Sequence, residues 1–405
     1  LYPNSTTKDI HYILGHSEAE VLAVQNAEYF AKVTAGGAKI PERVRLILSF
    51  DGDTSFSPIA ISYEKAISEG KRIAHGRKLE ELLDRLDPKE PSFMIYTSGT
   101  TGNPKGALLC QDNLAFTADI IKRRWKLPEV GSLFSFLPLS HIAEKLHSVA
   151  VGISSRYVTS YCSKFENVGK ELPEVEPTLL LCVPRVWEKM MEGVLHKLER
   201  AEEPKKSLIA WALGVGERVA RAKYAGKTPS LVDLLAHPVA DRVALSKIRQ
   251  ALGLGKAEVM ASGAAPLPAH VARWFRNIGL EILEDYGSTE TTGVVATTMR
   301  GMECAGTVGK PLEGCEFQLA HDGEILTRGR HVFLGYLNDP KNTADALKDG
   351  WYYTGDLGQW TQSGLLRISG RKKEIMKTSG GKMIAPSPIE EKLKAVPFIS
   401  QVCLV

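Results

Sequence analysis

The sequence predicts an α/β fold in which a large domain of layered sheets carries most of the chain. Short apolar runs typical of buried strands recur along it, and helical patterns lie between several of them. Each motif that carries chemistry follows such a run, which is where open α/β sheets place their ligands. With 405 residues, 43% of them hydrophobic, the chain is long enough to bury a large core.

The elements follow in order from the apolar pattern. Seven strands are expected, at residues 21–24, 44–50, 92–96, 133–137, 178–183, 257–261 and 281–286. Between Trp187 and Leu198 the apolar residues fall at helical spacing until Pro204, and a second helix is expected from Ser207 to about Tyr224. This helical pair either packs on the body of the protein or forms a surface that contacts lipid.

The C-terminal third predicts a change of architecture. After Phe317 the pattern turns to short strands and tight turns, at 321–326 and at Gly335-Tyr336, and predicts a small β subdomain. A hinge and a second domain are expected to begin near Gly370. We therefore expect a large domain over residues 1–369 and the beginning of a small domain over residues 370–405.

Charge and cysteine content exclude several classes of protein. The formal net charge of +4 is too mild to suggest a nucleic-acid partner. Six scattered cysteines form no C-x-x-C pair and predict reduced thiols in a cytoplasmic protein. No apolar run approaches the roughly 18 residues that span a membrane. No signal peptide is expected, although the chain begins at Leu1 and its natural N-terminus is expected to lie upstream.

The most informative motif is the loop from Tyr96 to Gly106, Y-T-S-G-T-T-G-N-P-K-G. Such a loop can offer a phosphate chain several backbone N–H groups, four hydroxyls and the ammonium of Lys105. It is not a Walker A loop, because that motif needs Lys followed by Ser or Thr and here Gly106 follows Lys105. A plain glycine- and serine-rich loop is the alternative.

Three further motifs follow strands. Leu137 to Glu144 reads L-P-L-S-H-I-A-E, and Val259 to Leu267 is a strand followed by a turn of small residues that leaves backbone amides accessible. The stretch Glu284 to Thr292 contains Y-G-S-T-E, in which a Tyr can stack on a base, a Thr can donate to phosphate and a carboxylate can hold Mg²⁺.

Near the C-terminus, Asp356 lies on a T-G-D turn, where a carboxylate can accept two hydrogen bonds from a ribose diol. Arg371 offers a fork of donors that suits ribose or phosphate. Between Gly381 and Glu390 the sequence fits G-x-x-I-x-P-x-x-I-E. A basic solvated turn and a glycine turn before an ordinary helix are the alternatives for these last two segments.

Together these motifs resemble the adenylate-forming superfamily, which contains acyl-CoA synthetases, luciferases and adenylation domains of peptide synthetases. The resemblance implies a large adenylating domain followed by a small, mobile α+β domain. It implies catalytic roles for Lys105, Thr289, Glu290 and His141, the last at the acyl entrance. The nucleotide-binding residues that it implies are Thr97, Ser98, Gly99, Thr100, Thr101, Gly102, Lys105, Gly263, Ala264, Ala265, Asp285, Tyr286, Gly287, Ser288, Thr289, Asp356 and Arg371.

Individual roles follow from the same resemblance. Tyr286 stacks on adenine, beside the turn that begins at Gly263; Thr289 contacts the α-phosphate; Glu290 holds Mg²⁺; and Asp356 binds ribose. Lys373 is the hinge about which the small domain rotates, and Gly380 and Gly381 help form the channel for coenzyme A. Many relatives carry Asp where this chain has Gly370, so the role of that Asp is absent here.

The segment Val183 to Lys189 and the long helical insertion after it resemble bacterial long-chain acyl-CoA synthetases in particular. The implied reaction joins a long-chain fatty acid to CoA with ATP and Mg²⁺ as cofactors. The family also has a further stretch before residue 1 and a catalytic lysine beyond residue 405, so the small domain is expected to be truncated here.

Several alternatives stay open at this point. The acyl-adenylate could pass to a carrier protein instead of CoA, or the chain could be a catalytically silent scaffold that binds nucleotide and fatty acid. Between Arg185 and Lys256, fourteen Lys or Arg stand against eight Asp or Glu. This basic segment is either a solvated helical face or a surface for anionic lipid, at the inner face of the membrane, or for the phosphates of CoA. The oligomeric state is open, with a homodimer as one option.

Overall fold

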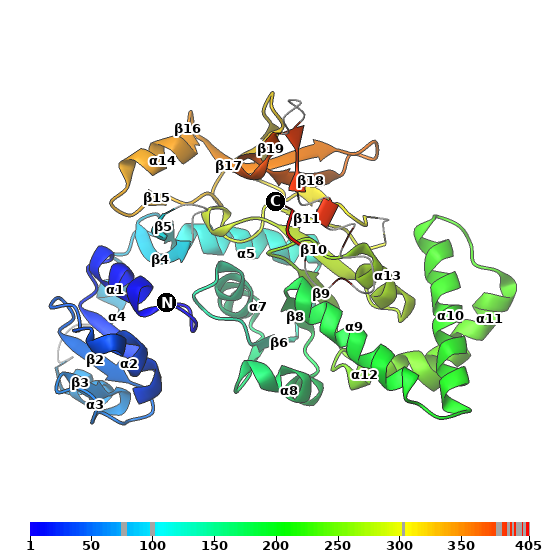
Figure 1. Ribbon diagram of the computed structural model, residues 1–405, viewed down its shortest axis with the longest axis horizontal. Coiled ribbons are helices and arrows are strands. Elements are labelled where there is room, and N and C mark those ends of the chain that lie inside the picture. Colours follow the sequence, from blue (N-terminus) through cyan, green and yellow to red (C-terminus); the bar gives the residue numbers. More distant parts are fainter. Residues whose placement is uncertain are drawn as a thin grey trace. The chain divides into compact units, whose positions relative to one another are not determined.

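The chain folds into two compact units, one of residues 1–111 and 333–343 and the other of residues 112–332 and 344–405. The structure is a computed structural model and describes residues 1–73, 79–97, 102–301, 304–377, 383–386, 389–390, 393, 399 and 402–404. The elements of each unit are labelled in Figure 1. None of the helices in these ranges is both long and apolar enough to cross a membrane.

The first unit contains a parallel sheet, β1-β2-β3, and an antiparallel sheet, β15-β5-β4. Residues of α1 and α2, among them Leu14 and Phe30, pack with Ile47 of β2 into a small core. The elements are α1 (Thr7–His16), β1 (Val21–Val24), α2 (Ala27–Val33), η1 (Ala35–Gly37), β2 (Leu46–Ser49), β3 (Ala60–Ser62), α3 (Tyr63–Ile73), α4 (Leu79–Leu83), β4 (Pro91–Thr97), β5 (Lys105–Cys110), β15 (Gly335–Tyr336) and the part of α14 (Pro340–Ala346) up to Thr343.

The second unit is built on a sheet in the order β12-β11-β10-β9-β8-β6-β7. The five strands from β10 to β7 run parallel, and β11 and β12 extend the sheet antiparallel. The elements up to the last of these strands are α5 (Gln111–Trp125), β6 (Ser132–Ser135), α6 (Ile142–Glu144), η2 (Lys145–Val151), α7 (Gly152–Ser155), β7 (Val158–Tyr161), η3 (Phe165–Asn167), α8 (Val168–Val175), β8 (Leu179–Cys182), α9 (Pro184–Glu199), α10 (Lys205–Tyr224), α11 (Leu231–Ala240), η4 (Asp241–Leu245), α12 (Ser246–Ala251), β9 (Val259–Ser262), α13 (Ala269–Asn277), β10 (Ile282–Tyr286), η5 (Thr289–Thr291), β11 (Ala296–Thr297) and β12 (Lys310–Pro311).

A second sheet of this unit has the order β13-β14-β17-β16, with β18 paired to the other part of the long strand β17. A short hairpin, β19-β20, follows it. The elements are β13 (Glu316–Leu319), β14 (Glu324–Arg328), β16 (Leu347–Lys348), β17 (Trp351–Trp360), β18 (Leu366–Arg371), η6 (Lys372–Glu374), β19 (Met376–Lys377) and β20 (Met383–Ile384).

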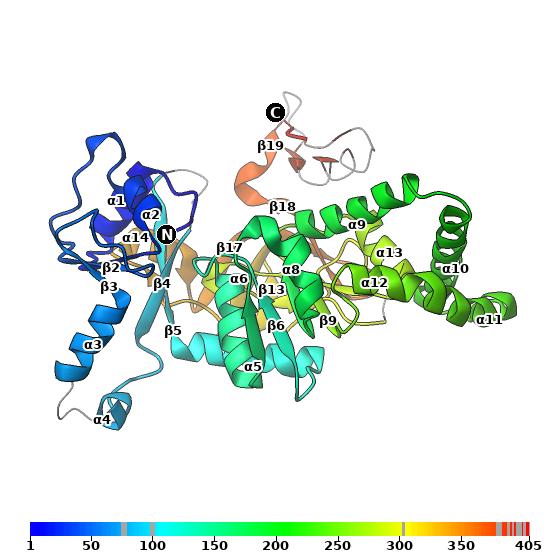
Figure 2. The same ribbon diagram turned by 90° about the horizontal axis from the view of Figure 1, so that it is seen from below.

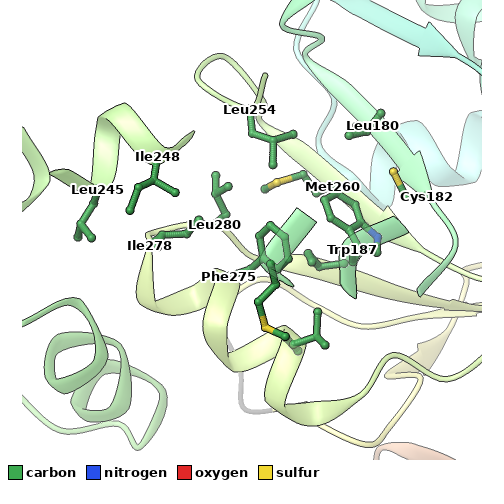
Figure 3. Close-up of a cluster of buried hydrophobic side chains, with 14 of the residues drawn as sticks. Leu180, Cys182, Trp187, Leu245, Ile248, Leu254, Met260, Phe275, Ile278 and Leu280 are labelled. Carbon is green, nitrogen blue, oxygen red and sulfur yellow. The ribbon is translucent and has the colours of Figure 1, made fainter. Parts of the chain in front are cut away.

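The largest core of the second unit lies between its parallel strands and the helices α9, α12 and α13. Trp187 of α9 is fully buried, and its ring meets that of Phe275 edge-on at 5.2 Å. Figure 3 shows these two rings beside Met260 of β9, with Leu245 of η4 and Ile248 of α12 in the same cluster. The apolar stripe predicted for α9 therefore faces the core.

The α/β fold predicted from the sequence is confirmed, and all seven expected strands are present, as β1, β2, β4, β6, β8, β9 and β10. The two expected helices are α9 and α10. The prediction that residues 335–336 belong to the small β subdomain was wrong. Gly335 and Tyr336 form β15, which pairs with β5 of the first unit and not with the later β strands. Two residues carry too little pattern to reveal a partner so distant in sequence.

Candidate functional site

Three predicted residues from separate motifs meet in the second unit. The Tyr286 hydroxyl, at the end of β10, donates a hydrogen bond of 2.9 Å to Oδ2 of Asp356 in β17. Arg371 lies directly opposite Asp356 in the β17–β18 ladder, and its Nε is 3.2 Å from Oδ1. The two carboxylate oxygens are therefore each held by a different donor, and the three motifs form one polar cluster.

The electrostatics of Asp356 reflect this position. Burial raises the pKa of Asp356, while the Arg371 guanidinium and the hydrogen bond from Tyr286 oppose that rise. The carboxylates of Glu290 and Glu374 push the pKa of Asp356 further up. Glu290, the predicted magnesium residue, is thus close enough to raise the pKa of Asp356, the predicted ribose residue.

The T-G-D turn is fixed by residues that sequence reasoning did not single out. Glu324, in β14, accepts hydrogen bonds from the Gly355 backbone N–H (3.0 Å) and from Lys372 Nζ (2.8 Å). The Thr354 hydroxyl accepts from the Asp356 N–H at 3.1 Å. Glu324 follows the Asp322-Gly323 turn, which the sequence marked only as part of a short strand with a tight turn, so no pattern pointed to this supporting role.

The Y-G-S-T-E segment forms a tight turn that leads into η5. A side chain at Gly287 would place its Cβ only 2.4 Å from the Gly293 carbonyl oxygen, so this position requires glycine. The Ser288 N–H donates to the Thr291 hydroxyl at 2.8 Å, and Thr292 adopts a left-handed conformation with φ 56°. These constraints fix the backbone on both sides of Thr289 and Glu290.

Glu290 is the residue predicted to hold a magnesium ion. Glu290 is buried, with 8% of its surface exposed. In the described part of the chain no three His, Cys, Asp or Glu residues gather into a metal cage. Mg²⁺ is usually bound through one or two carboxylates together with phosphate oxygens and water. A single carboxylate beside the predicted nucleotide site would therefore suit magnesium that arrives bound to phosphates.

The small-residue turn lies beside the Tyr286 motif because β9 and β10 are parallel neighbours. Ser262 pairs with Glu284 in this ladder, and the Glu284 carboxylate accepts a hydrogen bond of 3.3 Å from the Leu267 N–H beyond the turn. Ala264 has a φ of +69°, which few residues with a side chain adopt. Ala264 and Ala265 are exposed, so their backbone is open to a flat ring.

Asp285 has surroundings unlike those expected of a group that contacts nucleotide through its side chain. Its carboxyl group is 3% exposed and lies 3.9 Å from Nε2 of His147, whose ring stacks on Trp125. Burial raises the pKa of Asp285 to about 8 and lowers the pKa of His147 to about 4. Both groups are therefore uncharged at neutral pH, and a contact from Asp285 to nucleotide would have to come from its main chain.

His141, predicted at the acyl entrance, caps the short helix α6. Its Nδ1 accepts a hydrogen bond from the Ala143 N–H at 3.2 Å, so the proton of the neutral ring resides on Nε2. Burial lowers the pKa of His141. Nearby, the Glu144 carboxyl accepts hydrogen bonds from Ser135 and Ser148. The cap gives His141 a structural role in α6, and its role at the acyl entrance stays a prediction.

Lys105 belongs to the first unit, where it begins β5. Its Nζ donates to Oδ1 of Asn342 at 2.6 Å and lies 5.1 Å from the centre of the Tyr336 ring. The Asn342 side-chain N–H in turn donates a hydrogen bond of 2.6 Å to Oδ2 of Asp339. Asn342 and Tyr336 were missed by sequence reasoning, because both lie more than two hundred residues beyond Lys105.

The rest of the phosphate loop is only partly described. Thr97 ends β4, and Gly102 has a φ of +105°, which favours glycine. Residues 98 to 101, which include the predicted Ser98, Gly99, Thr100 and Thr101, lie outside the described residues.

The predicted hinge follows β18. Gly370 has a φ of +143°, which favours glycine over residues with a side chain, and Lys373 lies exposed in η6. Gly380 and Gly381 lie outside the described residues, so their predicted role at the CoA channel stays a prediction.

Comparison with known proteins gives this arrangement a family. The profile of the AMP-binding enzyme family matches residues 1–337. The long-chain-fatty-acid–CoA ligase FadD15 of Mycobacterium bovis is 35% identical over 409 residues, which cover all of this chain and 66% of that protein. The long-chain-fatty-acid–CoA ligase ACSBG2 of Xenopus laevis is 32% identical over 419 residues, which cover 100% of this chain and 56% of that protein.

Solved structures agree on the fold. ATP-bound MatB from Rhodopseudomonas palustris aligns with a TM-score of 0.69 at 22% identity, over 99% of this chain and 68% of that one. The chain spans between about half and two thirds of the length of ACSBG2 and FadD15. The family predicted from the nucleotide motifs is confirmed: this chain belongs to the AMP-binding enzyme family.

Proposed function

We propose that the protein is an ATP-dependent ligase that joins a long-chain fatty acid to coenzyme A in two steps. The fatty acid carboxylate first attacks the α-phosphorus of ATP, which gives acyl-adenylate and releases pyrophosphate. The CoA thiol then attacks the acyl carbon, loses its proton and displaces AMP. The long-chain substrate is supported by the names of the relatives FadD15 and ACSBG2.

One observation carries the nucleotide part of this proposal, namely the contact of Tyr286 and Arg371 with Asp356. A carboxylate has about four acceptor sites, and the hydroxyl and the guanidinium occupy two of them. The remaining sites can accept hydrogen bonds from both hydroxyls of a ribose. The same hydrogen bond fixes the phenol of Tyr286, so its ring can lie against adenine without losing further freedom.

The charged residues would act on the phosphates. The Asn342 amide oxygen orients the Lys105 ammonium without cancelling its charge. That cation would neutralise charge as pyrophosphate departs, and Thr289 would donate to the α-phosphate. Bound through Glu290 and the phosphates, Mg²⁺ would supply Lewis-acid stabilisation of the same charge.

The division into two domains is part of the proposal. A large domain over residues 1–369 would bind ATP and fatty acid. A small domain beginning at residue 370 would rotate about Lys373, so that one site serves both reactions in turn. The exposure of Lys373 in η6 supports a hinge, because its side chain can move without disturbing a packed core.

The test separates the two half-reactions on the full-length protein. Pyrophosphate release is followed with ATP, Mg²⁺ and a series of saturated fatty acids, without CoA and then with it, while AMP release reports the second step. We expect fatty-acid-dependent pyrophosphate release, and AMP release only after CoA is added. Fatty-acid-dependent pyrophosphate release with no effect of CoA would favour an acceptor carrier protein, and no pyrophosphate release would favour a silent scaffold.

A further inference from the structure

Helices α10 and α11 form an arm of the second unit whose outer helix carries an exposed apolar face. Leu231, Val232 and Leu235 are 73%, 74% and 70% exposed, and Val239 is 54% exposed. In both views of the molecule, α11 is the outermost helix of its unit (Figures 1 and 2). Contiguous apolar side chains on a surface mark a site of interaction more often than isolated ones do.

The opposite face of α11 is firmly attached. Asp233 accepts a hydrogen bond of 2.8 Å from Arg218 of α10, and its N–H is capped by Ser230. Ala240 at the end of α11 is fully buried. Leu245 of η4, the helical segment that follows α11, belongs to the largest core of the second unit. The helix therefore keeps its leucines outward because its other face is packed, and its exposure is a fixed feature of the fold.

The arm also carries an excess of positive charge. Residues 205–242 contain seven Lys or Arg and three Asp or Glu. All three acidic side chains are neutralised locally, in the pairs Arg218–Asp233, Arg221–Glu217 and Arg249–Asp241. The remaining basic residues of the arm are Lys205, Lys206, Lys223, Lys227 and Arg242.

We propose that the α10–α11 arm docks on the surface of an anionic lipid bilayer. An interfacial helix places its apolar face about 5–10 Å into the boundary of headgroups and acyl chains, while basic residues contact anionic lipid. Leu231, Leu235 and Val239 would enter that boundary. Trp211 of α10, 42% exposed, has the amphipathic ring favoured at the same depth.

A second copy of the chain fits this face less well. A ten-residue helix is about 15 Å long and about 10 Å wide, so it offers far less than the ~800 Å² per partner of a stable interface. Two copies meeting through this face would also bring two surfaces of the same charge together. Anionic lipid instead complements the charge and needs no matching shape.

Vesicle sedimentation tests the proposal with the full-length protein. The probes are vesicles of phosphatidylcholine alone and of phosphatidylcholine with phosphatidylglycerol, each at low and high salt. We expect binding to the anionic vesicles that weakens with salt. The double variant Leu231→Glu/Leu235→Glu should bind on the order of tenfold or more weakly. The control Val130→Glu/Ile153→Glu changes residues that are 88% and 74% exposed elsewhere and should bind like the parent.

A second variant isolates the charge. Lys223→Gln/Lys227→Gln/Arg242→Gln should weaken binding to anionic vesicles on the order of a hundredfold, because each basic residue near the surface contributes about 1 kcal/mol. Equal binding of the parent to neutral and anionic vesicles would overturn the proposal. So would unchanged binding of the leucine variant, or a dimer in sedimentation velocity that the leucine variant abolishes without any vesicle binding by the parent.

The inference does not rest on the proposed reaction. Pyrophosphate release with fatty acid dispersed in detergent should be the same in the leucine variant and the parent, because the arm contributes no residue to the nucleotide site. Loss of vesicle binding with retained pyrophosphate release therefore tests the arm alone, whereas absence of pyrophosphate release in the parent would contradict only the proposed function.

Discussion

Replacing Asp285 by Asn should make the second unit more stable at neutral pH. The Asp285 carboxyl is buried 3.9 Å from an uncharged imidazole, and burial raises its pKa from 3.8 to about 8. At neutral pH the folded protein therefore keeps a proton on Asp285 that the unfolded chain has released. Asn has the same shape and never ionises, so the variant avoids the free energy that this protonation costs.

The size of the effect follows from the pKa. Each pH unit above the unfolded pKa lowers the free energy of unfolding of the parent, relative to the variant, by about 1.4 kcal/mol. The difference should be near zero below about pH 4 and on the order of 4 kcal/mol at pH 7, and it should stop growing near pH 8. His147 titrates in the opposite sense, since its lowered pKa costs stability as the pH falls from 6.5 towards 4. Because His147 is present in both proteins, the comparison isolates Asp285.

The assay is hydrogen–deuterium exchange in urea, read from peptides that cover β10, at a series of pH values. Peptides covering β2 of the first unit serve as an internal reference. A matched variant is Asp119→Asn, whose carboxylate is 63% exposed and pairs with Arg123 on the surface, so it should change little at any pH. Equal pH dependence of β10 in Asp285→Asn and the parent would refute the assignment of a proton to Asp285.

The remaining predictions concern the proposed reaction. Lys105→Ala should slow pyrophosphate release on the order of 10²-fold, and an unchanged rate would contradict its action on the phosphates. Glu290→Ala should abolish acyl-adenylate formation while circular dichroism shows an intact fold; adenylation at the parental rate in Mg²⁺ would exclude the metal role. Tyr286→Phe removes the hydrogen bond to Asp356 and should raise the KM for ATP about tenfold, and an unchanged KM would argue against a positioned ring. Lys373→Pro should spare adenylation and damage thioester formation, because Pro fixes φ where rotation is required; equal loss in both half-reactions would contradict a hinge.

The residues of the proposed nucleotide site could be named from the sequence because local strings report on local backbone. The turn after β9 and the motif after β10 were each visible in sequence, and parallel pairing of the two strands makes them neighbours. Gly287 shows why such a string predicts its own backbone conformation. A Cβ there would meet the Gly293 carbonyl at 2.4 Å, so the residue type itself encodes the turn.

The supporting residues could not be predicted, because their partners are far away in sequence and follow no period. Glu324 fixes the T-G-D turn from another strand, and Asn342 holds Lys105 across more than two hundred residues. His147 lies on the same helical segment as the predicted His141, yet only the fold shows that it faces Asp285. Nothing in the local pattern separates these polar residues from others on the surface.

The helical insertion shows the limit of periodicity most clearly. The apolar stripe of α9 turns inward, where Trp187 is fully buried and Met191 is 8% exposed. The apolar positions of α11 have a similar period, yet Leu231 and Leu235 face outward, because the Arg218–Asp233 pair ties the opposite side of α11 to α10. Periodicity identifies the apolar face of a helix. Whether protein or lipid covers that face depends on which neighbouring side chains hold the helix, and for α11 those contacts leave the leucines outside.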